Sequence, residues 1–342
     1  MRDIRELQYF QSLPLAMKVQ MTEQRIQGWY EYFEGKVYIS FSGGKDSTVL
    51  LNIARQMYPS IEAVFVDTGL EYSQIRSFVN TFDNVTILKP KMQFAEVIKK
   101  YGYPLISKEV SKTAQSAVTA KKRGNTTPSL LKMQGKWNDP SGNISRYNQK
   151  KWMPLLDVDF RLSSRCCDMM KKSPCKKFEM KTGKKPITAQ MACESKLRED
   201  MWLHYGCNAF DNKRPVSNPM SFWTEQDVLR YIYENRINIC SVYGDVVCDD
   251  AQLNFDGEWV TKYHTTGCTR TGCVFCGFGA HLPEDPPRFL MLKQIDPKKY
   301  NYCFSGGEFI DGVWQPNKNG LGMQYVYEKL NELYGDGFVI YK

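Results

Sequence analysis

Strand-like and helix-like patterns of apolar residues follow one another near the start of the chain. Val37, Ile39 and Phe41 alternate with other residues, which predicts a strand over 37–41. The next segment, "STVLLNIARQMY", has apolar residues at helical spacing. "IEAVFVDTG" is then a short, nearly continuous apolar run, as in a parallel strand buried on both faces. The pattern therefore predicts strand, glycine turn, helix and second strand.

Further candidate elements continue this alternation along the chain. We expect strands at "VTILKP" and "PITAQM", helices over 22–34, 168–181 and 224–235, and a helix in "MQYVYEKLNELYG". In the helix over 224–235 we expect Thr224 to be the N-cap. Strands that alternate with helices indicate an α/β fold with a doubly wound parallel sheet, which binds ligands at the carboxyl ends of its strands.

The periodic pattern is lost between residue 107 and about residue 152. The stretches "RGNTTPS" and "NDPSGN" break it, so we interpret this segment as an insertion or a flexible lid. We expect a first domain over 1–235 that contains a basic insertion at 107–151. Residues 236–342 are expected to form a cysteine-rich, metal-binding part followed by a C-terminal helical region.

The insertion is rich in positive charge. The chain of 342 residues has a formal net charge of +9, and residues 107–151 hold only two acids, Glu109 and Asp139. Against these stand ten cations: Lys108, Lys112, Lys121, Lys122, Arg123, Lys132, Lys136, Arg146, Lys150 and Lys151. With Trp137 and Tyr147 interleaved, the segment is suited to follow a phosphate backbone and to stack on bases. A solvated surface insertion is the alternative interpretation.

Composition places the chain among globular proteins of the cytoplasm. Apolar residues make up 42% and charged residues 24%, and no stretch approaches the roughly 18 apolar residues of a membrane span. The start, "MRDIRELQYF", carries charges where a signal peptide needs an apolar segment. We therefore expect a cytoplasmic location and no membrane partner. Eleven cysteines without a secretory signal predict metal or redox use rather than disulfides.

The stretch "SFSGGKDS" lies between the first predicted strand and its helix. Glycines at such a turn let backbone N–H groups converge on an anion, and the helix N-terminus adds partial positive charge. Lys45 adds a full charge. The spacing does not fit the P-loop pattern of ordinary ATPases and kinases. The alternative is a tight turn at Gly43 and Gly44, with Asp46 or Ser47 only capping the helix.

"SGGKDS" resembles the pyrophosphate loop of the N-type ATP pyrophosphatases, the PP-loop superfamily, which cleave ATP between the α and β phosphates and transfer AMP to a substrate oxygen. This resemblance implies a loop for the β,γ-pyrophosphate formed by Ser42, Gly43, Gly44, Lys45, Asp46 and Ser47. It also implies that Lys45 and Asp46 act in catalysis. Lys45 would stabilise the leaving pyrophosphate, and Asp46 would hold Mg²⁺ or water.

Further motifs resemble the phosphoadenosine phosphosulfate (PAPS) reductase-like branch of this superfamily. "VDTGLEY" is similar to a motif that lies near the nucleotide, which implies roles there for Asp67, Thr68, Gly69 and Glu71. "NPMSFWTEQDVLRYI" resembles the branch's signature helix, with Leu229 where tryptophan is usual. "QMACESKLR" keeps Glu194, Ser195 and Arg198 of a further motif and lacks its glycine and first arginine.

The cysteines fall into two groups with metal-site character. "TGCTRTGCVFC" contains Cys273-x-x-Cys276, the spacing of a metal knuckle, with Cys268 close by. "CCDMMKKSP" resembles the cysteine run of the iron–sulfur sulfonucleotide reductases, although Met170 replaces an arginine. This resemblance implies a [4Fe–4S] cluster on Cys166, Cys167, Cys273 and Cys276, with Cys268 in reserve. Four thiolates on structural Zn²⁺ are the alternative.

These resemblances imply an ATP pyrophosphatase that adenylates DNA or tRNA for sulfur incorporation. "RTGCVFC" is also similar to the pyrophosphatase subunit of DNA phosphorothioation systems, so a cysteine desulfurase or other sulfur donor is an expected partner, and a homodimer is possible. A reductase of adenosine phosphosulfate (APS) or PAPS is the alternative. The intact Lys45 and the absence of cysteine from "YGDGFVIYK" disfavour it. A non-catalytic regulator that binds nucleic acid is a third hypothesis.

Overall fold

The computed structural model describes residues 2–253 and 259–342, which fall into two compact units. Unit 1 consists of Met1–Asp67, Glu71–Lys89 and Pro174–Thr271, and unit 2 of Thr68–Leu70, Pro90–Ser173 and Gly272–Lys342. The units are therefore interleaved along the chain. The division into 1–235 and 236–342 stays a prediction about independently folding domains.

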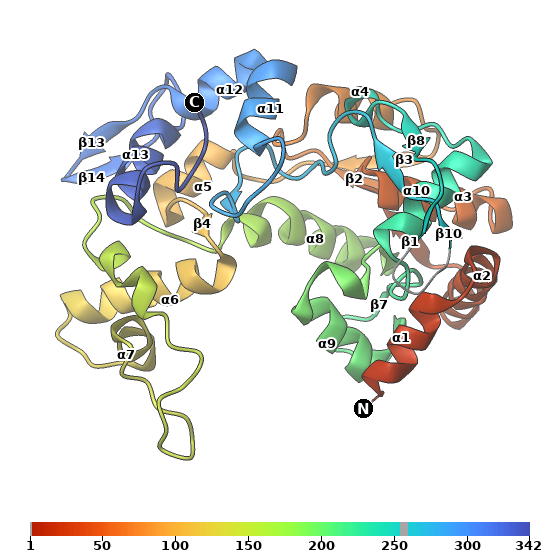
Figure 1. Cartoon of the computed structure of the whole chain (residues 1–342), viewed down its shortest axis with the longest axis horizontal. Helices are drawn as coiled ribbons and strands as arrows, with labels where there is room; N and C mark the ends of the chain where they lie inside the picture. The colour runs from red at the N-terminus through yellow and green to blue at the C-terminus, as the bar shows by residue number, and fades with distance from the viewer. Residues whose placement is uncertain (1, 254–258) are drawn as a thin grey trace. The chain divides into compact units, whose positions relative to one another are not determined.

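Unit 1 is built on a six-stranded sheet (Figure 1). Its strands, in spatial order, are β3 (Val85–Leu88), β2 (Ala63–Val66), β1 (Val37–Ser40), β5 (Lys185–Ile187), β7 (Val216–Ser217) and β6 (Asn208–Ala209). All neighbouring strands are parallel except β6 and β7. Ile39 of β1 lies opposite Ala63 on one side and Ile187 on the other. The predicted α/β fold with a largely parallel sheet is confirmed.

The burial of β1 and β2 follows from their place in the middle of this sheet. Tyr38 and Ile39, which point to opposite faces, are both buried, as are Ala63, Val64 and Phe65 of β2. Strand order changes direction between β1 and β5, because β2 and β3 continue on one side of β1 and the later strands on the other. The carboxyl end of β1 is thus a topological switch point, where sheets of this kind bind ligands.

Helices before and between the strands complete unit 1. They are α1 (Ile4–Ser12), α2 (Leu15–Tyr32), α3 (Lys45–Met57), α4 (Ser73–Val79), α8 (Ser173–Thr182, which begins at the unit boundary), α9 (Lys196–Tyr205) and α10 (Glu225–Asn235), with single turns η3 (Ala192–Glu194) and η4 (Ser241–Tyr243). Two short antiparallel pairs follow, β8 (Val246–Cys248) with β11 (Tyr263–Thr265) and β9 (Gln252–Leu253) with β10 (Trp259–Val260).

The N-terminus of α10 confirms the predicted cap. The Thr224 side chain accepts a hydrogen bond from Asp227 N, and the Asp227 carboxylate accepts one from Thr224 N at 2.7 Å. Asp227 also pairs with the buried Lys18 of α2, at 2.6 Å between Nζ and Oδ2. This reciprocal cap fixes where α10 begins, and Glu225 is its first residue.

Unit 2 is mainly helical. Its helices are α5 (Phe94–Tyr101), α6 (Lys108–Lys122), α7 (Pro128–Gln134), α11 (Arg288–Ile295), α12 (Pro297–Phe304) and α13 (Met323–Tyr334), with short helical segments η1 (Lys150–Leu156) and η2 (Asp168–Lys172). Strand β4 (Leu105–Ile106) pairs in parallel with β12 (Gly277–Phe278), and β13 (Glu308–Ile310) pairs with β14 (Val313–Gln315).

The interpretation of residues 107–152 as a segment without periodic structure is wrong. The segment forms α6 and α7, and with η1 these pack around a buried cluster of Ala114, Ala117, Ala120, Leu130, Met133 and Leu156. Three of these six residues are alanines spaced three apart on α6. Alanine favours helix and lets helices approach closely, but it adds little to a hydropathy pattern. The stripe therefore escapes a search for large apolar residues.

Within the described part of the chain, none of the helices combines the length and the apolar character that crossing a membrane requires.

Candidate functional site

The loop Ser42–Ser47 connects β1 to α3 at the switch point of the sheet. Gly44 is the N-cap of α3, and Gly43 has a φ of +72°. A Cβ on Gly43 would lie 2.9 Å from side-chain carbons of both Ile75 and Val79 in α4. Glycine at 43 is thus required both by the backbone conformation and by the close approach of α4.

Replacing Gly43 with alanine is expected to lower the free energy of unfolding by about 1–2 kcal/mol more than Gly183→Ala does. Gly183 has a similar φ of +71° with nothing within 4 Å of its added Cβ, so it reports backbone strain alone. The difference measures the overlap with α4. Urea unfolding of both variants gives the comparison, and equal losses would contradict the close approach.

Hydroxyl groups of the protein accept hydrogen bonds from the backbone N–H groups of this loop. Ser42 N donates to Ser47 Oγ at 3.2 Å, Gly44 N to Ser42 Oγ at 3.3 Å and Lys45 N to the Tyr243 hydroxyl at 3.3 Å. A hydroxyl turns easily to other partners, so phosphate oxygens can replace these acceptors at little cost. The donors of the loop thus already converge, an arrangement that suits an anion.

The Lys45 side chain is directed into the site and is held there. Its side chain is 7% exposed, and Nζ donates to Glu225 Oε1 and to the Thr269 carbonyl, both at 2.7 Å. The centre of the Tyr243 ring lies 5.8 Å from Lys45 Nζ. The Glu225 carboxylate is about half exposed, so water or an anionic ligand can reach this pair. The lysine is thus a buried cation with an exchangeable partner.

Asp46 supplies a carboxylate beside this cation. Its Oδ1 is buried and has no hydrogen-bond partner among the described residues. Burial raises the pKa of Asp46 above its usual value and Glu225 adds to the rise, while Lys45 and Arg270 act in the opposite direction. A buried carboxylate oxygen without a partner, next to an anion loop, fits a site for Mg²⁺.

Two arginines extend the positive charge of the site. Burial lowers the pKa of Arg198 and the neighbouring Arg270 lowers it further, whereas Asp46 raises it. Arg198 forms an ion pair with Glu194 at the start of α9. Arg270 lies between Thr269 and Thr271, which bond Lys45 Nζ and the Tyr243 hydroxyl, respectively. The structure thus gathers several cations around Asp46, as a polyphosphate requires.

Several of these neighbours are missed by the sequence analysis. Glu225, Tyr243 and Arg270 are not among the predicted site residues. Glu225 and Tyr243 form hydrogen bonds with Lys45, and the charge of Arg270 acts on Asp46. In the sequence, only the position of Arg270 between Cys268 and Cys273 pointed to a place near a functional site.

The motif after β2 lies at the neighbouring strand end. Because β1 and β2 are parallel, Asp67 follows β2 at the same edge of the sheet as the loop. Asp67 is buried and pairs with Arg76 of α4 at 2.8 Å. Thr68 and Glu71 are buried too, and Gly69 has a φ of +75°. The placement of Asp67 agrees with a role near a nucleotide, which stays a prediction for all four residues.

The four cysteines predicted as ligands are neighbours within unit 2. A hydrogen bond to Cys167 raises the pKa of Cys166, as do burial and the thiols of Cys273 and Cys276. Burial also raises the pKa of Cys276, to about 11. Cys268 belongs to unit 1, where its backbone N–H donates to the Val242 carbonyl. Its role as a reserve ligand stays a prediction.

Cys167 differs from its three neighbours. The hydrogen bond from Cys166 and the positive charges of Lys108 and Lys171 lower its pKa. The thiolate is the form that binds metals, so the thiol set fits an iron–sulfur cluster or Zn²⁺. In the described ranges, however, no three side chains of the ligand types are close enough together to enclose a metal ion. Metal binding would require the four thiols to come closer together than they are here.

Comparisons with known proteins bear on the family of the chain. The sequence matches the phosphoadenosine phosphosulfate reductase domain family over residues 36–122 and 131–277, more than half of the chain. An uncharacterized protein of Methanocaldococcus jannaschii, MJ0973, is 39% identical over 303 residues, which are 85% of this chain and 54% of that protein. A second one, MJ0066, is 34% identical over 84 residues, 23% of this chain and 18% of that protein.

The chain thus spans about half the length of MJ0973 and a smaller part of MJ0066. Among solved structures, a phosphoadenylyl-sulfate reductase from Candida auris in complex with phosphate is similar at 14% identity and a TM-score of 0.37. The match covers 70% of this chain and 91% of that one.

Proposed function

This chain belongs to the phosphoadenosine phosphosulfate reductase domain family, and from that premise we propose that it is an ATP pyrophosphatase that adenylates a nucleic acid for sulfur incorporation. The observation that carries the proposal is Lys45. Its buried ammonium lies at the anion loop and is held by a carboxylate and a carbonyl that a ligand can displace. Such a charge suits the β,γ-pyrophosphate of ATP, which a sulfonucleotide lacks.

The loop and its cations suit cleavage between the α and β phosphates. The N–H groups of Ser42, Gly44 and Lys45 bind the β and γ phosphates, and Lys45 exchanges Glu225 for them. An oxygen of the acceptor attacks the α-phosphorus, the bond to the bridging oxygen breaks, and pyrophosphate leaves with its charge stabilised by Lys45. A reduced sulfur nucleophile from a donor protein then displaces AMP.

Asp46 is the residue that would hold Mg²⁺, which when bound neutralises charge on the phosphates. The four neighbouring cysteines would hold a [4Fe–4S] cluster or Zn²⁺. We assign that group either the binding of the incoming sulfur or the support of the fold, and place no step of adenylation on it.

The test is a chromatographic assay of adenine nucleotides with anaerobically purified protein, ATP and Mg²⁺, with and without DNA or tRNA. We expect AMP and pyrophosphate to accumulate when the right nucleic acid is present. Parallel reactions contain APS or PAPS with a reductant. Sulfite from APS or PAPS, with ATP untouched, would instead establish the reductase function.

Replacing Glu225 with glutamine is expected to lower the KM for ATP by about two- to fivefold, because a half-exposed ion pair of this kind is worth up to about 1 kcal/mol. The glutamine keeps the size of the side chain and removes the charge that competes with phosphate for Lys45. Glu234→Gln is the matched control, since Glu234 lies on the same helix and pairs with Arg230 on the surface. A raised KM would mean that Glu225 itself contributes to binding.

A further inference from the structure

The part of unit 2 that follows α7 forms an ordered, projecting loop, which we call the finger and define as residues 137–148 (Figure 1). Asn138 and Ile144 form an antiparallel bridge. At the tip, the Asp139 carboxylate accepts hydrogen bonds from the N–H groups of Ser141 and Asn143, both at 2.9 Å. At the base, Asn148 bonds both the N–H and the carbonyl of Trp137. The finger is thus held by its own hydrogen bonds.

The finger exposes apolar and aromatic side chains next to a cation. Ile144 is 78% exposed and Tyr147 is 55% exposed. The Arg146 guanidinium lies 5.0 Å from the centre of the Tyr147 ring and donates a hydrogen bond to its hydroxyl at 3.0 Å. This arrangement orients the guanidinium before any ligand binds. A solvated face needs charge, but it does not need a large exposed aliphatic side chain beside an aromatic ring.

The segment of unit 2 that contains the finger is rich in positive charge. All ten cations of residues 107–151 except Lys132 are exposed. Lys121 pairs with Asp157, while the two acids of the segment are engaged, Asp139 in the finger turn and Glu109 by Gln149. The surface therefore keeps a strong excess of positive charge, which attracts a polyanion.

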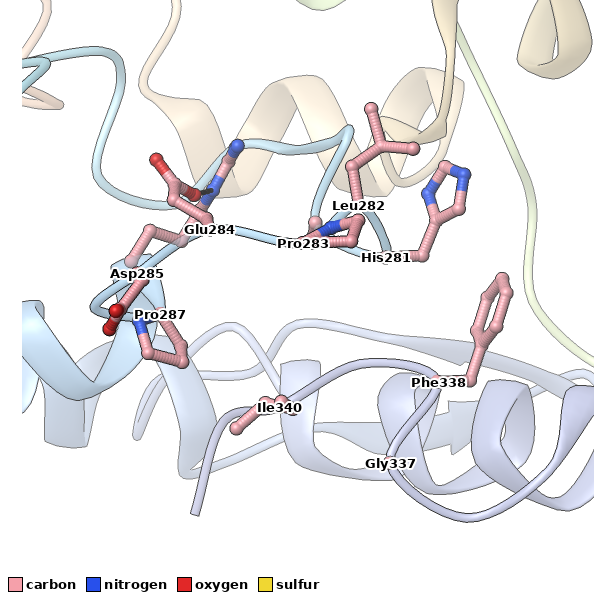
Figure 2. A pocket seen from close by; sticks show the side chains of 11 residues that line it. His281, Leu282, Pro283, Glu284, Asp285, Pro287, Gly337, Phe338 and Ile340 are labelled. Carbon is pink, nitrogen blue, oxygen red and sulfur yellow. Dashed lines mark hydrogen bonds and ion pairs between the residues drawn. The ribbon is translucent and has the colours of Figure 1, made fainter.

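A cavity of about 510 Å³ lies in unit 2 between the 281–287 loop on one side and the 337–340 segment on the other (Figure 2). Its lining is largely apolar, with the stacked rings of His281 and Phe338 at 5.1 Å. The polar part consists of the Asp285 carboxylate and of Glu284, which is paired with Arg288 at 2.8 Å. Trp152 packs edge-on against His281 at 5.5 Å. Trp152 follows the finger by four residues, so the chain that leaves the finger reaches the cavity at this ring contact.

The charge of the basic segment reaches this cavity. The Lys151 ammonium lies 5.0 Å from the Trp152 ring. Burial lowers the pKa of His281, and the positive charges of Lys151 and Arg288 lower it further. A ligand that enters here therefore meets aromatic rings, the acceptor Asp285 and the paired Arg288 in the cavity, with Lys151 close by. Rings beside hydrogen-bonding groups and cations are the pattern that recognises a nucleotide.

We propose that the finger and the adjoining cations of residues 121–151 bind a single-stranded nucleic acid, one unpaired base of which enters the cavity between residues 281–287 and 337–340. The cations follow the phosphates, Tyr147 stacks on a base, and His281 with Phe338 offers a ring surface to the base in the cavity. A single strand fits better than a duplex, because paired bases cannot stack on side chains or enter a cavity. This inference rests on the proposed function only in taking nucleic acid as the acceptor.

The test is fluorescence anisotropy of labelled oligo-dT and oligo-U of about 12 nucleotides, and of a duplex of the same length, without ATP. We expect the single strands to bind more tightly than the duplex, and the two single strands tell DNA from RNA. Arg146→Ala combined with Tyr147→Ala is expected to weaken binding by about tenfold, and Arg146→Ala alone to reduce the slope of log K against log salt by about 0.7.

The cavity is tested by Phe338→Leu, which keeps apolar volume and removes the ring. A second variant, Ile340→Ala, changes a half-exposed position, where truncation disturbs folding less. Each is expected to weaken binding of the single strand by severalfold. Tyr9→Ala, an exposed tyrosine on α1, is the control that leaves affinity unchanged. Unchanged affinity in the finger variant or in both cavity variants, or equal affinity for the duplex, would overturn the inference. ATP cleavage is measured separately, so its presence or loss judges the proposed function alone.

Discussion

Lys45→Ala is expected to lower the rate of AMP formation from ATP by about a hundredfold to a thousandfold, as the removal of one well-placed charge from a transition-state site does. The leaving pyrophosphate develops charge at the position that the ammonium faces. The change in stability is expected to be small, because the Glu225 carboxylate that loses its partner is about half exposed and water can solvate it. The assay measures AMP by chromatography, and thermal unfolding checks the fold.

Lys36→Ala is the matched control for this experiment. Lys36 precedes β1 and is exposed, and its ion pair with Glu34 is 3.3 Å long. It removes the same charge from the same unit without touching the loop, so AMP formation should continue at the original rate. If Lys45→Ala keeps that rate as well, the loop does not act on a pyrophosphate leaving group, and the regulator hypothesis becomes the better one.

Replacing Cys167 with serine is expected to remove the metal from the protein almost completely. Cys167 is the thiol whose pKa is lowered, by Cys166, Lys108 and Lys171, so it is the most ready of the four to bind as a thiolate. Serine keeps the size of the side chain but is a poor ligand for iron or zinc. Iron, acid-labile sulfide and zinc are measured in anaerobically purified protein. Iron with sulfide identifies a cluster, and zinc alone identifies the alternative.

Two further cysteines make this experiment discriminating. Cys303 is fully buried on α12 of unit 2 and is not among the predicted ligands, so the Cys303→Ala protein should keep its metal content. Cys268→Ser tests whether Cys268 is a ligand. The variant protein keeps its metal if the complete ligand set is Cys166, Cys167, Cys273 and Cys276. A Cys167→Ser protein with its full metal content, or an original protein that contains none, would contradict the proposed centre.

The metal experiment and the Lys45 experiment also separate two contributions to activity. If the cysteine-bound group only supports the fold, Cys167→Ser lowers the unfolding temperature and its residual folded protein still forms AMP. If the group binds the incoming sulfur, AMP forms normally while sulfur incorporation stops. Either result leaves the assignment of Lys45 unchanged, because the loop and the cysteines belong to different compact units.

Local patterns in the sequence were sufficient to predict the elements that position the loop. β1, α3 and β2 lie where the alternating and helical patterns predicted them, and Thr224 caps α10 as expected. These features depend on residues close together in the chain: glycine at a left-handed turn, a hydroxyl that bonds the N–H three residues on, and apolar residues at a fixed period. The family resemblance added the prediction that the four cysteines form one ligand set, which no spacing alone establishes.

Only the tertiary structure decided which groups face the loop. The partners of the Lys45 ammonium are 180 and 224 residues away in sequence, at Glu225 and Thr269, and Tyr243 bonds the lysine's backbone. The tertiary structure also decided that α6 and α7 pack on an alanine stripe. The finger therefore follows two helices, where the sequence had predicted a loop. Periodicity describes the environment along one element, whereas these contacts depend on how distant elements are brought together, and no local pattern encodes that.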